Sequence, residues 1–254
     1  MESATGTVRH PKGASEPASG PDARAFVRSV VESSVGSKVL VALTGTGLAA
    51  FVIFHMIGNL KLFQGPDAIN SYAYFLKHNL GALIWVARGG LLAIFALHLA
   101  LAIRLKRRAI AARPVPYAFP GSAQAGVASR TMIHTGVVIG LFALFHLAHF
   151  TFGWVTGTSY LDMTDAKGHH NVYEMMVAGF SNKVLAVLYL AAQFALFVHL
   201  RHGIPSAFQT LGLKNALFRK PIEIFGLAIA LAVSIGNCAI VLAVQVGWVT
   251  SRLA

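Results

Sequence analysis

Five long stretches of this 254-residue chain carry no charged side chain. A helix that crosses the hydrocarbon core of a bilayer needs roughly 20 predominantly apolar residues. Only 12% of the residues are charged, about half of the share in an ordinary soluble domain. The charge-free stretches are residues 39–60, 89–103, 131–161, 184–200 and 224–251, and the second is extended back through Arg88 to reach a spanning length. The sequence therefore predicts an all-α membrane protein with transmembrane helices near 39–62, 81–104, 131–155, 183–203 and 222–249.

The distribution of positive charge predicts how these helices cross the membrane. The segments 1–38, 104–130 and 201–220 carry 15 Lys and Arg residues, and the loops on the opposite side carry five. Because Lys and Arg gather on the cytoplasmic side, we expect a multi-pass protein of the cytoplasmic membrane, with its N-terminus inside and its C-terminus outside. The net charge of +12 then reflects topology and contact with lipid headgroups or an acidic partner, and we expect no nucleic-acid binding.

Composition divides the chain into two regions. Residues 1–25 are rich in Gly, Ala, Ser and Pro, so we expect a disordered N-terminal tail. Residues 26–254 are expected to form the transmembrane domain, with residues 25–38 giving a short interfacial helix at its start. The single cysteine, Cys238, excludes a disulfide framework within the chain and a C-x-x-C-H site for covalent haem.

Four histidines lie within the first four predicted spans, one in each: His55, His98, His146 and His199. Polar residues inside a membrane are costly and usually face a functional interior. At a rise of about 1.5 Å per residue, His55 and His146 lie about 24 and 22 Å from the inner edge. His98 and His199 lie about 25 and 24 Å from the outer edge. The imidazoles thus form two layers, very roughly 15–20 Å apart, and two pairs of axial ligands are what two b-type haems require.

Other interpretations compete with haem ligation. A single intramembrane histidine is often only a hydrogen-bond donor between helices, although two matched layers of two are harder to explain in this way. His149, one turn beyond His146, is an alternative ligand for the outer layer. A transporter whose histidines carry protons or a metal is an alternative from another class. It would be expected to show discontinuous helices or an inverted repeat, and neither is clear in the sequence.

Taken together, several segments resemble one family: the single-chain, five-helix, two-haem cytochrome b subunit (b558-type) that anchors succinate dehydrogenase or fumarate reductase in the membrane. The resemblance covers about residues 33–250. The segments that carry it are SSVGSKVLVALTG at 33–45, FHMIGNLKLFQGPDAINSYAYFLK at 54–77, WVARGGLLAIFALHLALAIRLKRR at 85–108, ASRTM at 128–132, FHLAHFTFG at 145–153, VYEMMVAGFSNK at 172–183 and HLRHGIPSAFQTLG at 199–212.

The resemblance implies that the first four helices form a bundle around two haems b. Its axial ligands carry over to His55, His98, His146 and His199, pairing the first helix with the third and the second with the fourth, and it selects His146 over His149. It further implies a flavoprotein subunit, an iron–sulfur subunit and a membrane quinone as partners, with menaquinone expected ahead of ubiquinone. This chain would pass electrons between the iron–sulfur subunit and quinone.

The chain has no flavin motif and no cysteines for iron–sulfur clusters, so no dicarboxylate chemistry of the tricarboxylic acid cycle is expected from it alone. The cytochrome b subunit of another quinone-linked enzyme, such as a hydrogenase or formate dehydrogenase, is the redox alternative, which the loop motifs disfavour. One departure from the family concerns the intramembrane glutamates of some fumarate reductases. Phe197 stands where one such acid would lie, so a glutamate-based proton path is not expected.

Four further residues are candidates for contact with a cofactor. Arg88 lies about 10 Å from the outer edge of the second span, where its guanidinium could bind a haem propionate or simply reach the interface. Asn59, one turn after His55, could orient a ligand or a propionate, or bridge two helices. Arg130 and His134 lie near the inner layer and are expected to contact haem propionates or quinone.

Overall fold

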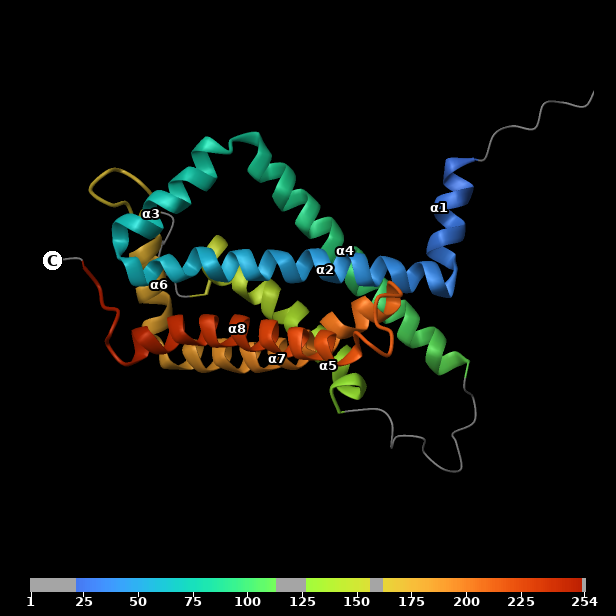
Figure 1. Cartoon of the computed structure of the whole chain (residues 1–254). Coiled ribbons are helices and arrows are strands. Elements are labelled where there is room, and N and C mark those ends of the chain that lie inside the picture. The colour runs from blue at the N-terminus through green and yellow to red at the C-terminus, as the bar shows by residue number, and fades with distance from the viewer. Residues whose placement is uncertain (1–21, 113–126, 156–161, 253–254) are drawn as a thin grey trace, which may run out of the picture.

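The computed structural model describes residues 22–112, 127–155 and 162–252, and within them it is built of helices with no strand longer than an isolated bridge (Figure 1). Five helices are long and apolar enough to cross a membrane, as predicted. These helices are α2 (Ser34–Asn59), α4 (Ala82–Ala111), α5 (Val127–His146), α7 (Lys183–Thr210) and α8 (Arg219–Gln245). The chain is therefore a multi-pass, all-helical membrane protein by length and composition of its helices.

Shorter helical segments connect or extend the long ones. They are α1 (Ala23–Glu32), the 3-10 turn η1 (Leu60–Gln64), α3 (Pro66–Tyr74), the π-helical turns η2 (Phe75–Asn79) and η4 (Leu147–Thr151), and α6 (Val172–Ser181). Gly65 separates η1 from α3 with a φ of 99°, a conformation that favours glycine, and Pro66 then occupies the first turn of α3.

Local hydrogen bonds explain where the long helices begin. The Ser33 hydroxyl accepts the Gly36 N–H at 2.8 Å, so α2 starts five residues before the predicted span. The Asn182 side chain caps α7 in the same way, accepting the Val184 N–H at 2.9 Å, and α7 starts where predicted. The capping residues therefore determine where α2 and α7 begin, and hydropathy alone does not.

The interfacial helix expected at residues 25–38 is α1, which the structure ends at Glu32 and sets at a steep angle to α2 (Figure 1). Two arginines of α4 hold its last turn. Arg104 Nη1 donates to the Val31 carbonyl at 3.0 Å, and Arg108 Nη1 donates to the Glu32 carbonyl at 2.7 Å. Because unpaired carbonyls give a helix C-terminus partial negative charge, these guanidinium groups stabilise it. Helix α4 itself continues to Ala111, seven residues beyond the predicted span near 81–104.

Four of the long helices pack in a closed ring. The neighbouring pairs are α2 with α4, α4 with α5, α5 with α7, and α7 with α2, so α2 faces α5 and α4 faces α7 across the centre. Helix α8 lies outside the ring, along α7 and against α2 (Figure 1). The diagonals of this ring are the helix pairs that were expected to share their histidines.

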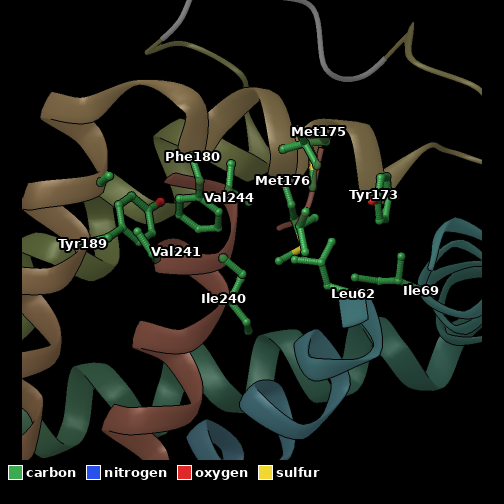
Figure 2. Packing of buried hydrophobic residues seen from close by; sticks show 14 residues of the cluster. Leu62, Ile69, Tyr173, Met175, Met176, Phe180, Tyr189, Ile240, Val241 and Val244 are labelled. Atoms are coloured by element: carbon green, nitrogen blue, oxygen red, sulfur yellow. The ribbon is translucent and has the colours of Figure 1, made fainter. Parts of the chain in front are cut away.

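The best-packed core lies at the α6 end of the bundle (Figure 2). It joins η1, α3, α6, α7 and α8 through large side chains that are almost fully buried. The residues labelled in Figure 2 are Leu62, Ile69, Tyr173, Met175, Met176, Phe180, Tyr189, Ile240, Val241 and Val244. Tyr189 belongs to this core and also reaches the histidines described below, so the core fixes part of the candidate site.

A polar network closes the same end outside the spans. The Asn70 side-chain amide donates to Asn171 Oδ1 at 3.1 Å and to Asp165 Oδ2 at 3.3 Å, and its oxygen accepts the Tyr173 N–H at 3.0 Å. Burial raises the pKa of Asp165, but the backbone N–H groups of His169 and Lys167, together with Asn70, outweigh it and hold that pKa below its ordinary value. Asn70 thereby ties α3 to the loop before α6 and to α6 itself.

Candidate haem-binding site

Each predicted ligand lies in one helix of the ring. His55 is near the end of α2, His98 is in α4, His146 ends α5, and His199 is in α7. We call His55 and His146 the outer pair, and His98 and His199 the inner pair, after their predicted depths. The outer pair lies on the α2–α5 diagonal and the inner pair on the α4–α7 diagonal.

The structure brings the outer pair together. The ring centroids of His55 and His146 are 5.8 Å apart and the ring planes are perpendicular. Phe51 stacks on His55 at 5.4 Å, and Phe142 and Phe150 lie beside His146 at 6.0 and 5.7 Å. Two imidazoles from opposite helices therefore face one another within an aromatic surround.

The two rings of the outer pair are held differently. The OH group of Tyr189 lies 3.1 Å from Nδ1 of His146, which directs the hydrogen bonding of that ring to Nδ1. In contrast, it is Nε2 of His55 that lies 3.1 Å from Nδ2 of Asn59 on the same helix. The predicted contact of Asn59 with His55 is thus present, and it uses the ring nitrogen that would otherwise face a metal.

His149 differs from the four predicted ligands in its exposure. It is 0% exposed, and its Nδ1 lies 2.9 Å from the same Tyr189 OH group. The four predicted ligands are half-buried or, for His55, exposed within the chain. The π-helical turn η4 follows His146 directly and carries His149. His146 is therefore the more exposed of the two imidazoles, and the choice between them stays a prediction.

The inner pair is held by two threonines that the sequence analysis did not single out. Thr44 Oγ1 lies 3.1 Å from Nδ1 of His98, and Thr135 Oγ1 lies 3.2 Å from Nδ1 of His199. The glycine after each threonine lies against the same ring. A Cβ atom on Gly45 would stand 2.9 Å from Cε1 of His98, and one on Gly136 would stand 3.3 Å from Cε1 of His199.

These contacts also measure the spacing of the two layers. Thr44 precedes His55 by eleven residues, and Thr135 precedes His146 by eleven residues. Along a helix, eleven residues correspond to about 16 Å. The inner pair therefore lies about 16 Å along the helix axes from the outer pair, within the spacing expected from the sequence.

A short sequence pattern could have identified both threonines. The segments 44–55 and 135–146 both read T-G-x9-H, and they share phenylalanines at the eighth and eleventh positions. Tyr189 had no comparable signal, because its role depends on how α7 packs against α5 and on the π-helical turn.

The remaining candidates lie apart from these contacts. The guanidinium group of Arg88 lies over the ring of Trp85 on its own helix, 4.9 Å from the ring centroid, and no hydrogen bond or ion pair of Arg88 is present among the described residues. His134 is exposed, and Arg130 lies in the first turn of α5. The contacts of Arg88, Arg130 and His134 with a propionate or quinone stay predictions.

Residues of α3, η2 and the loop before α6 form a small hollow of about 240 Å3 at the α6 end of the bundle. Tyr74 is stacked between His78 and His169, with ring centroids 4.2 and 4.0 Å away. Burial and the charge of Lys77 lower the pKa of His170 in the same hollow, against a hydrogen bond with the Met163 backbone. The hollow is thus aromatic and basic.

The donor set fits haem better than a bare metal ion. Within the described ranges, no three His, Cys, Asp or Glu side chains converge as a metal site would require. A b-type haem needs only two axial imidazoles. The hydrogen bonds of His98, His146 and His199 engage Nδ1 and leave Nε2 for a bond to iron. Nε2 of His55 becomes available to iron in the same way once its hydrogen bond with Asn59 is broken.

Comparison with known proteins adds no family to these observations. No family model, no curated protein and no solved structure matches the chain.

Proposed function

We propose that the chain is a two-haem cytochrome b that carries electrons across the cytoplasmic membrane, as the anchor subunit of a succinate:quinone oxidoreductase. The observation that carries the proposal is that each helix of one ring holds one histidine. His55 and His146 meet across the ring, and Thr44 and Thr135 hold His98 and His199 about 16 Å away along the helices. The resemblance of residues 33–250 to that family adds the partners: a flavoprotein subunit, an iron–sulfur subunit and a quinone.

Within this proposal, His55 and His146 ligate one haem and His98 and His199 the other. Bound haem supplies a one-electron carrier whose potential depends on its axial ligands and their hydrogen bonds. Tyr189 positions His146, and the half-buried Phe142 and Phe150 beside His146 limit the access of water. The cluster of Lys and Arg at residues 104–108 gives a basic face for the iron–sulfur subunit and favours the cytoplasmic side for it.

Substitution of each histidine by leucine tests the ligand assignment. In the complex purified from membranes, each of the four single variants is expected to lose one haem, measured as pyridine haemochrome per polypeptide. His149→Leu is the matched control, because it removes an imidazole one turn from His146 and is expected to keep both haems. Retention of two haems in any of the four variants would contradict the assignment of that histidine as a ligand. Loss of a haem in the control would instead assign His149 as the outer ligand.

Partner subunits test the rest of the proposal. Gentle solubilisation and affinity purification of the chain are expected to bring down a flavin-containing subunit and an iron–sulfur subunit. A haem-containing complex with a nickel- or molybdenum-containing subunit would instead place the chain in another quinone-linked enzyme. A preparation without haem would leave the transporter as the better explanation of the four histidines.

A further inference from the structure

The inner pair is held by two copies of one arrangement. In each copy, a threonine and the following glycine of one helix contact the histidine of the next membrane-spanning helix. Thr44 and Gly45 of α2 contact His98 of α4, and Thr135 and Gly136 of α5 contact His199 of α7. The two histidines therefore have equivalent surroundings on opposite sides of the ring.

The available protons determine the direction of the contact to His98. Nδ1 of His98 lies 3.2 Å from the Val41 carbonyl, which can only accept a hydrogen bond, so Nδ1 carries the proton. The Thr44 hydroxyl donates its own proton to the Leu40 carbonyl at 2.6 Å. The Thr44 oxygen then has only lone pairs to direct toward the ring of His98, so it accepts a hydrogen bond from Nδ1–H of His98. The proton on Nδ1 leaves Nε2 of His98 unprotonated.

The contact to His199 follows the same rule. The Thr135 hydroxyl has carbonyl acceptors at Thr131 and Met132, each at 3.1 Å. Met132, three residues before Thr135, interacts with His199 through its backbone, as Val41 does with His98. The hydroxyl of Thr135 therefore also accepts from Nδ1–H, and Nε2 of His199 is unprotonated.

The glycines keep the rings where these bonds can form. A Cβ on Gly45 at 2.9 Å from Cε1 of His98 is closer than real contacts allow, so the ring of His98 would have to move. At Gly136 the same distance is 3.3 Å, so His199 would have to yield by less. The threonine supplies the acceptor and the glycine supplies the room.

We propose that Thr44 and Thr135 are positioning residues that hold His98 and His199 as the Nδ1-protonated tautomer, with Nε2 available to a metal. This inference rests on the proposed function in one respect, since the metal would be the iron of the inner haem. A metal-ligating histidine generally has its other nitrogen fixed by an acceptor, which sets the tautomer and raises the basicity of the ligand. A helix-packing role alone would make no demand on the tautomer.

The first experiment reads the tautomer directly. The full chain is labelled with 15N-histidine, purified in lipid nanodiscs and reduced so that any low-spin haem iron is diamagnetic, and the imidazole nitrogens are assigned with single His→Gln variants. The inference predicts a protonated Nδ1 and an unprotonated or metal-bound Nε2 for both His98 and His199. A proton on Nε2 of either ring would overturn it, and this result is available whether or not the chain binds haem.

The second experiment removes one acceptor at a time. Thr44→Val and Thr135→Val keep the shape of the side chain and remove the hydroxyl, while Thr44→Ser keeps the hydroxyl. Thr46→Val is the matched control, because Thr46 Oγ1 donates to the Ala42 carbonyl at 2.9 Å and has no recorded bond to a histidine. The Val41 carbonyl remains in Thr44→Val, so weakening of the Nδ1–H bond is expected and not its complete loss.

The readouts are the Nδ1–H chemical shift and the midpoint potential of the inner haem. Removal of either acceptor is expected to shift Nδ1–H toward weaker hydrogen bonding and to lower the affinity for ferric haem by about 10- to 100-fold. The potential should rise, because a less basic ligand stabilises ferric iron less. The serine variant should behave as the wild type. Thr44→Val and Thr135→Val variants that match Thr46→Val in both readouts would overturn the inference. A chain that binds no haem would overturn the proposed function, and the Nδ1–H shift would then decide the inference alone.

Discussion

Asn70→Leu is the substitution whose effect on stability can be worked out most fully. Asn70 is 1% exposed and makes three hydrogen bonds, to Asn171, Asp165 and the Tyr173 N–H. Leucine has the same branched shape but a larger volume, and it forms none of them. At about 0.5–1.5 kcal/mol for each bond, the loss of three bonds is about 1.5–4.5 kcal/mol. For a chain of this size that corresponds to a fall in Tm of roughly 3–18 °C.

The assay is thermal unfolding of the detergent-solubilised protein, followed by tryptophan fluorescence. Asn79→Leu is the control, because Asn79 is exposed and its side chain has no recorded hydrogen bond in the described part of the chain. The control is expected to keep the wild-type Tm. If both variants unfold at the wild-type temperature, the network at Asn70 does not stabilise the fold.

Three further substitutions test other contacts. Tyr189→Phe removes the bonds to two imidazoles and should lower the free energy of unfolding by about 1 kcal/mol, measured as a lower Tm; an unchanged Tm would contradict the bonds. Gln193→Leu and Asn237→Leu, alone and together, should give a coupling energy of about 0.6 kcal/mol, because Asn237 donates to Gln193 at 3.0 Å inside the membrane; additive effects would refute that bond. Because the pKa of Asp165 is lowered in the folded protein, ionised Asp165 stabilises the fold fully above its ordinary pKa of 3.8, and this stabilisation is lost as the pH falls further. Asp165→Asn should therefore reduce the fall of Tm at acid pH. Parallel curves of Tm against pH for the variant and the wild type would contradict this.

Much of the fold could be predicted because the membrane leaves few choices. Long charge-free stretches identified all five spans, and helix rise placed His55 and His146 at one level. The ends of the helices were harder, since they depend on local bonds. Hydropathy falls at Arg104, but the helix continues to Ala111, and Arg104 and Arg108 bind the end of α1.

The supporting residues of the candidate site were predicted less well than the histidines. Thr44 and Thr135 escaped notice because a threonine in an apolar helix ordinarily bonds its own backbone, and only the repeated T-G-x9-H pattern marks them. Tyr189 could not be assigned, since its partners lie on α5. Arg88 was placed correctly within α4, but sequence position could not reveal that its guanidinium lies over Trp85.

An optical spectrum decides whether the four histidines bind two haems. The chain is purified from membranes with its native partners, and a dithionite-reduced minus oxidised spectrum is recorded together with pyridine haemochrome quantitation. We expect the spectrum of low-spin b-type haem, with two haems per polypeptide. A preparation that contains the folded chain but no haem would contradict it.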